Sequence, residues 1–389
     1  MNAQIENPGF NAKHAEQAHL LQVYGQFDFE PVAASGVTLT CRDGRELLDF
    51  YGGHAVASLG YGHPDAVRAI STQAEKLFFQ SNAVALEVRA QAADKLAAFA
   101  GMDRVFLCNS GAEANENALR IALRKTGRNK ILALEQGFHG RTAAAGAVTW
   151  GSADKWYGFP RTPFDVEFIP RDDAAAAVAA IDDSVAAVIL EPVQGIAGAY
   201  ALGSEFVKAV ADACKQSGAL LICDEVQCGV GRCGAPFAIH LHNVKPDIMT
   251  TAKALGTGFP VGAVMLSEDV ASVLNIGDLG TTFGGAPLAC ALINTVLDVI
   301  ERDKLIDNVK TLSARIKSEC VIGPVQQISG EGFLLGLRCD GGAAPVRTKL
   351  LSAGILTGSS NDADVMRLLP PLTLDGKHVD ALVAALKSI

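Results

Sequence analysis

A carboxylate and an amine occupy positions where an α/β protein could place reactive groups. Asp224 follows the apolar run at 219–223, and α/β sheets bind ligands at the carboxyl ends of buried strands. Lys253 follows the largely apolar run at 247–252. Apolar surroundings disfavour its ammonium form and leave a nucleophilic amine. Taken singly, Asp224 could cap a helix or form a loop salt bridge, and Lys253 could be an ordinary solvated lysine.

Two polar loops between apolar runs carry groups that bind anions. The segment CNSGAE at 108–113 predicts a strand end, a polar turn and a helix N-terminus. The amides and hydroxyl of Ser110, Gly111 and Ala112 would suit a phosphate there. In FHGRT at 138–142, Arg141 can bind a carboxylate through two hydrogen bonds. The alternatives are an ordinary capped helix and an ion pair between Arg141 and a surface acid.

The order of these features favours one kind of chemistry. An anion cradle, an aromatic loop at Phe138, an acid at a strand end and a lysine in apolar surroundings follow one another along the chain. The acid and the lysine are 29 residues apart, about the length of one strand–helix–strand unit. A pyridoxal phosphate site needs these groups to hold the phosphate, stack on the ring, pair with the ring nitrogen and bind the aldehyde.

A second glycine pattern does not predict a dinucleotide site. Gly229, Gly231 and Gly234 form G-x-G-x-x-G, but the preceding Asp224-Glu225 pair would repel a pyrophosphate. Pro236 follows almost at once, so no helix N-terminus opens there.

Composition excludes several classes of protein. The 389 residues suggest two or three domains, and 49% hydrophobic with 19% charged residues argues against disorder and coiled coil. A net charge of −9 disfavours nucleic acid as a partner.

We find no apolar run long enough for a transmembrane helix and no signal peptide, so no membrane association is expected. Nine scattered cysteines indicate reduced thiols in a cytoplasmic protein. The C-x4-C-x4-C spacing is not a zinc pattern, so no metal is expected.

The predicted elements alternate between strand and helix and then change in character. Six apolar runs predict buried strands, at 105–108, 130–134, 185–190, 219–223, 247–250 and 262–266. Helices are expected at 112–125, capped by Ser110 with Glu113 completing a capping box, and at 205–216, capped by Ser204 and ended by Gly218. The Ala-rich stretch at 174–180 predicts a surface helix.

The fold class is α/β, with a mostly parallel central sheet and a smaller α+β C-terminal domain. A helix at 287–302 leads into strands at 332–338 and 365–369 that flank a helix at 345–353. We place an N-terminal arm, part of the small domain, at 1–45, a large cofactor-binding domain at 46–285 and the small domain at 286–389.

Several segments together resemble the class III aminotransferases, from about Tyr24 to Pro371. They are NSGAEANE at 109–116, FHGRT at 138–142, EPVQG at 191–195, DEVQCGVGR at 224–232, TTAKALGTGFPVGA at 250–263 and GTTFGG at 280–285. Within that family, YGGHAV at 51–56 and MRLLPPL at 366–372 resemble the branch that acts on N-acetylornithine and N-succinylornithine. The resemblance implies a fold-type-I homodimer with pyridoxal 5′-phosphate bound at the subunit interface.

The resemblance also implies a role for each matching residue. Lys253 would form the Schiff base and then move the proton, and Asp224 would pair with the ring nitrogen. The other expected cofactor contacts are Ser110, Gly111 and Ala112 on the phosphate, Phe138 on the ring, Gln227 near the 3′-oxygen, and Thr282 on the phosphate of the neighbouring subunit. Arg141 would bind the substrate carboxylate far from the transferred amine. Arg367 would bind the α-carboxylate of 2-oxoglutarate.

One departure from the family pattern lies in the substrate region. Most relatives read E-P-[VI]-Q-G-E, whereas Glu191 here begins a segment that ends at Ile196. Ile196 cannot pair with Arg367, so Arg367 should be free or paired differently. We hypothesise that a less polar pocket near Ile196 admits a bulkier or more anionic acyl group, such as succinyl. The alternative is a neutral change in which another acid pairs with Arg367.

The expected reaction moves the terminal amino group of N2-acetylornithine or N2-succinylornithine to 2-oxoglutarate. The products are the acyl-glutamate semialdehyde and glutamate, as in arginine biosynthesis. Rival donors are ornithine, 4-aminobutyrate and a carrier-bound lysine. Ornithine is disfavoured as the donor because its charged α-amino group would have less acidic company where Ile196 replaces the family's second glutamate. Two other classes are an aminomutase of the glutamate-semialdehyde type, which needs no second oxo acid, and a cofactor-binding protein without catalysis.

Overall fold

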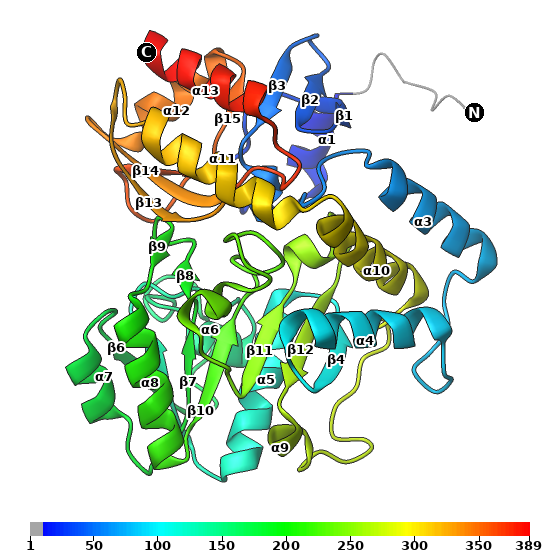
Figure 1. Cartoon of the computed structure of the whole chain (residues 1–389), viewed down its shortest axis with the longest axis vertical. Coiled ribbons are helices and arrows are strands. Elements are labelled where there is room, and N and C mark those ends of the chain that lie inside the picture. Colours follow the sequence, from blue (N-terminus) through cyan, green and yellow to red (C-terminus); the bar gives the residue numbers. More distant parts are fainter. Residues whose placement is uncertain (1–10) are drawn as a thin grey trace.

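A seven-stranded sheet forms the centre of the molecule. The computed structural model describes residues 11–389, and Figure 1 shows this sheet in its lower half. All strands run parallel except β12, which is antiparallel to both of its neighbours. In spatial order they are β4 (Arg104–Cys108), β12 (Gly262–Leu266), β11 (Ile248–Thr251), β10 (Leu220–Asp224), β7 (Val185–Leu190), β5 (Lys130–Leu134) and β6 (Asp165–Ile169).

The strand predictions agree with the structure where burial is complete. β5, β7 and β12 have the predicted bounds, β4 begins one residue earlier, and β10 and β11 are each shifted by one residue toward the C-terminus. The prediction omitted β6, which lies at the edge of the sheet and alternates between exposed and less exposed residues. An edge strand of this kind has no continuous apolar run, which explains the omission.

Helices cover both faces of this sheet. α5 (Gly111–Thr126) packs on one face against β12, β11, β10 and β7, over a buried cluster that includes Leu119 and Val264. The remaining helices around the large sheet are α3 (Pro64–Lys76), α4 (Glu87–Ala100), α6 (Ala143–Ala147), α7 (Ala174–Ala180), α8 (Ser204–Ser217), α9 (Glu268–Ala271) and α10 (Pro287–Arg302). Short elements in the connections are β8 (Val193–Gln194), β9 (Tyr200–Ala201), η1 (Ala238–His242) and η2 (Lys253–Gly256).

Two predicted helix caps were wrong in detail. Ser110 caps α5 by accepting a hydrogen bond from the Glu113 N–H, but the Glu113 carboxylate bonds to the Asn109 N–H at 2.8 Å and does not close a capping box. Ser204 is the first residue of α8, and its hydroxyl lies 2.9 Å from His242 Nδ1. The predicted stop at Gly218 is confirmed, with φ +75°.

The N-terminal strands and the C-terminal segment share a second sheet. β3 (Glu46–Asp49) pairs in parallel with β15 (Ile355–Leu356), and both lie above the large sheet in Figure 1. The other N-terminal elements are α1 (Ala12–His19), β1 (Pro31–Ser35), β2 (Thr38–Cys41) and α2 (Gly52–Ala55). The domain boundaries given above stay a prediction.

The C-terminal segment is α+β, and its first strand was missed. A three-stranded antiparallel sheet has the order β13, β14, β16. β13 was not predicted because most of its residues are polar and partly exposed. The elements are α11 (Leu305–Glu319), β13 (Val325–Glu331), β14 (Leu334–Cys339), α12 (Ala343–Ser352), β16 (Val365–Leu368) and α13 (Gly376–Ser388). In residues 11–389 no helix is both long enough and apolar enough to cross a bilayer.

Gly262 lets β12 approach the turn that precedes α5. A Cβ atom at this position would lie 2.5 Å from the Ser110 carbonyl oxygen. We expect Gly262→Ala to lower the free energy of unfolding by about 1–3 kcal/mol, because the backbone must shift to relieve the overlap. Thermal melting of Gly376→Ala serves as the control, since its Cβ would meet nothing closer than the flexible Arg315 side chain at 3.4 Å. Equal melting temperatures for the two variants would contradict the expectation.

Candidate active site

A cavity of about 440 Å³ lies where the strand ends of the large sheet meet the N-terminus of α5. It gathers residues from six separate parts of the sequence. Every predicted cofactor residue except Thr282 lines it, together with three predicted substrate residues. These are Ser110, Gly111, Ala112, Phe138, Asp224, Gln227 and Lys253, with Arg141, Glu191 and Ile196.

One end of the cavity is built to hold an anion. Helix geometry leaves the N–H groups of Gly111 and Ala112 without acceptors inside α5, and the helix dipole adds positive potential there. The position needs glycine, because a Cβ on Gly111 would lie 2.5 Å from Cγ1 of Val226. This cradle fits the phosphate of pyridoxal phosphate.

Asp224 is buried at the end of β10 and is surrounded by donors. Its Oδ2 atom lies 2.7 Å from Asn115 Nδ2 and 2.8 Å from His139 Nδ1, and its Oδ1 accepts from the Val226 N–H at 2.9 Å. Burial lowers the pKa of His139, but the hydrogen bond and charge of Asp224 outweigh this effect, so the pKa is raised overall. These three donors fix the orientation of the carboxyl group that would pair with a protonated ring nitrogen.

Lys253 begins η2, directly after β11 and Ala252. Its backbone has φ +44°, an uncommon conformation for a residue other than glycine. Burial lowers the pKa of its amine, against the opposing charges of Asp224 and Glu191. The neutral, nucleophilic form is therefore more accessible than in a solvated lysine.

Glu191 fixes two loops that line the cavity. Its carboxylate accepts from the backbone N–H of Phe138 at 2.9 Å and of Gly195 at 3.3 Å. Burial raises the pKa of this carboxyl. The structure thus shows Glu191 supporting the Phe138 loop, and its contact with substrate stays a prediction.

Arg367 is connected to the cavity through Gln227. Its guanidinium donates to Gln227 Oε1 at 2.9 Å and to the Ser359 carbonyl at 2.6 Å, and only 2% of the residue is exposed. Within residues 11–389 no acid forms an ion pair with Arg367, and the consequence of Ile196 in place of the family's glutamate stays a prediction. Because Gln227 Oε1 is already an acceptor, its Nε2 remains as a donor for a 3′-oxygen.

Arg141 and Thr282 complete the set of predicted residues. Arg141 is exposed at the cavity wall, 4.4 Å above the ring of Trp156, and makes no ion pair in the described part of the chain. Its guanidinium is therefore available to a carboxylate. Thr282 is exposed and does not line the cavity. Its contact with a neighbouring subunit stays a prediction.

Sequence reasoning missed three residues that hold Asp224. Asn115, His139 and Val226 all lie inside motifs that were recognised, but only the neighbouring residues were assigned roles. Asn115 follows Gly111 by one helical turn, so it points to the same side of α5. This four-residue spacing could have predicted that Asn115 faces the same cavity as Gly111. Nothing local indicates that His139 reaches Asp224.

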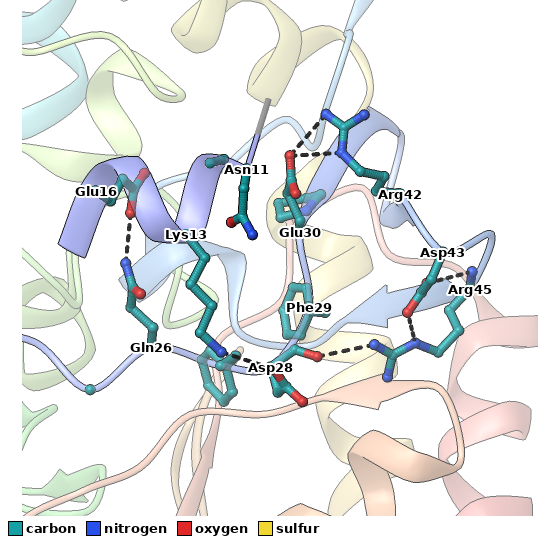
Figure 2. Close-up of a pocket in the computed structure, with 14 residues that line it drawn as sticks. Asn11, Lys13, Glu16, Gln26, Asp28, Phe29, Glu30, Arg42, Asp43 and Arg45 are labelled. Atoms are coloured by element: carbon teal, nitrogen blue, oxygen red, sulfur yellow. Dashed lines mark hydrogen bonds and ion pairs between the residues drawn. The ribbon is translucent and has the colours of Figure 1, made fainter. Parts of the chain in front are cut away.

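A larger cavity, of about 900 Å³, lies between α1 and the N-terminal strands (Figure 2). It contains none of the predicted site residues. Its charged side chains neutralise one another, with Lys13 3.0 Å from Asp28, Arg42 2.9 Å from Glu30 and Arg45 2.7 Å from Asp43. Volume alone therefore does not mark the reactive site.

Nothing in residues 11–389 brings three His, Cys, Asp or Glu side chains together in a way that could hold a metal ion. The G-x-G-x-x-G segment at 229–234 forms turns and a bend. A helix N-terminus, which a dinucleotide site would require, is missing from these turns.

Comparison with known proteins defines the class. The family model for aminotransferase class-III matches residues 22–389. The chain is 38% identical over 386 residues to the acetylornithine aminotransferase of Methanocaldococcus jannaschii, covering 96% of each protein. It is 37% identical over 383 residues to the acetylornithine/succinyldiaminopimelate aminotransferase of Yersinia pestis, covering 95% of this chain and 94% of that protein. The crystal structure of ornithine aminotransferase from Toxoplasma gondii superposes with a TM-score of 0.91 at 31% identity, covering 97% and 93% of the two chains.

The fold and the cavity are those of a pyridoxal phosphate-dependent transferase. The chain belongs to the class III aminotransferases. The resemblance read from the sequence motifs, the α/β fold class and the cofactor are confirmed.

Asn115 links α5 to Asp224 and to Thr250. It donates to Asp224 and to the His139 carbonyl, both at 2.7 Å, and accepts from the Thr250 hydroxyl at 2.6 Å. We expect Asn115→Ala to destabilise the protein by about 1–3 kcal/mol, because buried groups lose their partners, and to weaken cofactor retention. Chemical unfolding without cofactor and a cofactor titration would measure the two effects. The control is Asn117→Ala, whose amide bonds only within α5, donating to the Glu113 carbonyl at 2.8 Å and accepting from Arg120 at 3.3 Å. If both variants lost equal cofactor affinity, Asn115 would have no special role.

Proposed function

We propose that the protein transfers the terminal amino group of an N2-acylated ornithine to 2-oxoglutarate. The products are the acyl-glutamate semialdehyde and glutamate. One observation supports this assignment most directly. Arg141 lies at the wall of the cavity that Lys253 also lines, Arg367 is joined to the same cavity through Gln227, and neither arginine is neutralised by an acid of the described chain. Two such arginines suit an acceptor with a carboxylate at each end.

The residues around Lys253 support proton transfer at the amino-bearing carbon. Pyridoxal phosphate, when bound, supplies a ring that accepts the electron pair left when that carbon loses its proton. Asp224, held in place by its three donors, would pair with the ring nitrogen and keep the proton on it. Lys253 would bind the aldehyde and supply the amine that takes up and returns the proton, since burial favours its neutral form.

The anion-binding residues orient the two substrates. The N–H groups of Gly111 and Ala112 and the Ser110 hydroxyl would hold the phosphate, and Phe138 would pack against the ring. Arg141 binds the carboxylate far from the reacting carbon. Arg367 binds the carboxylate next to the reacting carbon of the oxo acid, as the family resemblance implies.

The donor is proposed from the relatives and from Ile196. Two relatives are named for acetylornithine, and one of them also for succinyldiaminopimelate, an amine with an anionic acyl group. Ile196 lines the cavity where the family pattern has an acid. The charged α-amino group of free ornithine would have no acidic partner there, whereas an acylated nitrogen is neutral and needs none.

The test is glutamate formation from 2-oxoglutarate with four separate donors: N-acetylornithine, N-succinylornithine, ornithine and 4-aminobutyrate. We expect kcat/KM to be at least about a hundred times higher for an acylated ornithine than for ornithine, because burying an unpaired ammonium is costly. Lys253→Ala is the inactive control. A preference for ornithine or 4-aminobutyrate would keep the class and overturn the donor. Amino transfer within one substrate, without 2-oxoglutarate, would favour an aminomutase.

We further propose a cytoplasmic homodimer in which Thr282 binds the phosphate of the neighbouring subunit. Large apolar side chains are exposed on the N-terminal arm and near Thr282, including Leu21 at 89%, Tyr24 at 80% and Phe283 at 64%. Patches of this kind commonly mark subunit interfaces. All nine cysteines are free and buried, which suits a reducing compartment.

Sedimentation should give twice the mass of one chain. Thr282→Ala should leave the dimer intact and weaken cofactor binding about tenfold, because a hydrogen bond to a charged phosphate is lost. Thr348→Ala, an exposed threonine whose hydroxyl bonds within α12, is the control. A monomeric protein, or unchanged cofactor affinity in Thr282→Ala, would contradict the shared site.

A further inference from the structure

Two arginine side chains, those of Arg347 and Arg367, bond to the backbone of one short segment, 357–359. Arg347, from α12, donates to the Thr357 carbonyl at 3.4 Å, and Arg367 donates to the Ser359 carbonyl at 2.6 Å. Gly358, between them, directs its own N–H and C=O to the Arg367 backbone, both at 2.9 Å. On an extended chain the two flanking carbonyls then point the other way, about 7 Å apart. Both guanidinium groups thus bond to one three-residue segment, and both lie close enough to Tyr51 for their charges to act on its phenol.

Tyr51 lies between the two arginine contacts. A Cβ on Gly358 would be 2.7 Å from Cδ2 of Tyr51, so the phenol ring packs directly on this glycine. The Tyr51 hydroxyl is 2.6 Å from Nε2 of His54. This places a hydroxyl and an imidazole beside the two cations.

The turn that presents Tyr51 and His54 is held in a strained conformation. His54 and Ala55 have φ of +65° and +66°, which residues other than glycine rarely adopt. This turn is joined to η2, the element that begins with Lys253, because Ser58 Oγ donates a hydrogen bond to the Ala254 carbonyl at 2.6 Å. Backbone strain of this kind collects where a binding site must be positioned.

The arginine cluster lacks a negative partner. In the described residues neither Arg347 nor Arg367 forms an ion pair with an acid, although Arg338, nearby in the same sheet, bonds to Asp362 and Asp364. Arg347 Nε and Thr357 Oγ1 are buried polar atoms without a hydrogen-bond partner. Burial, with the charge of Arg347 contributing, lowers the pKa of Arg367 to about 10. Unpaired buried donors around like charges are costly unless an anion joins them.

We propose that Arg347 is a second arginine of the carboxylate subsite and that, with Arg367 and Tyr51, it binds the carboxylate next to the carbonyl of the 2-oxo acid. Two guanidinium groups that bond to the same three-residue segment can both donate charge-assisted hydrogen bonds to a single carboxylate. This inference rests on the proposed function, because it assumes that Arg367 faces the oxo acid.

The subsite should act on only one of the two substrates. The carbon that carries the transferred amine of an N2-acylated ornithine has no carboxylate, whereas the reacting carbon of a 2-oxo acid does. Arg347 therefore contributes to binding the acceptor and leaves binding of the donor unchanged.

The decisive measurement is binding of 2-oxoglutarate to the pyridoxal form of the holoenzyme by calorimetry, since an oxo acid cannot be transaminated by that form. Arg347→Gln should raise the dissociation constant about tenfold, the loss expected when one charge-assisted contact is removed. Arg347→Lys should lose less, because it keeps the charge. Steady-state kinetics should show a matching rise in KM for 2-oxoglutarate, with kcat and the donor KM within about twofold of wild type.

The matched control is Arg338→Gln, an exposed arginine of the same sheet with acidic partners. It should bind 2-oxoglutarate like wild type, and all variants should keep the wild-type cofactor absorbance and melting temperature. Unchanged affinity in Arg347→Gln, or equal losses for donor and acceptor, would overturn the proposal. If wild type uses a different oxo acid, the proposed substrate fails, and the same titration with that acid still tests Arg347. Wild type that binds no 2-oxo acid would overturn both.

Discussion

The burial of the Asp224 carboxyl group is the constraint on which the site depends. A carboxylate removed from water is tolerable only when its oxygens accept hydrogen bonds, and Asp224 receives them from Asn115, His139 and the Val226 backbone. These donors come from α5, the loop after β5 and the turn after β10. The helix, the sheet and the loop must therefore dock correctly before the cavity exists at all.

The other buried acids near the site are occupied by backbone amides. Glu191 accepts from Phe138 and Gly195, and Glu225 accepts from the N–H groups of Ala238 and Ile239 at 2.9 and 2.7 Å. Burial raises the pKa of Glu225 to about 7. Because these carboxylates are engaged in holding loops, they do not neutralise the arginines. The positive charge that remains is available to carboxylate substrates.

Close packing around glycine sets the position of these charges. Gly111 approaches Val226, Gly262 approaches the Ser110 carbonyl, and Gly195 lies so close to Gln227 that a Cβ would overlap its side-chain amide. At each of these contacts an added methyl group would overlap a neighbouring atom, so the wall of the cavity cannot move outward without a change in packing. The arrangement is therefore a property of the docked backbone as much as of the reactive side chains.

The sequence by itself determined the strands buried on both faces and the helix at the anion cradle, and it predicted Lys253 and Asp224 as the central pair. These are local properties: β5, β7 and β12 are continuous apolar runs, and Ser110 stands just before a helical pattern. The same local view missed β6 and β13, whose pairing depends on neighbours distant in the chain. It also left His139, Asn115 and Arg347 without roles. Only the tertiary structure brings His139 to Asp224 and Arg347 beside Arg367, because both contacts join segments whose separation along the chain carries no periodic pattern.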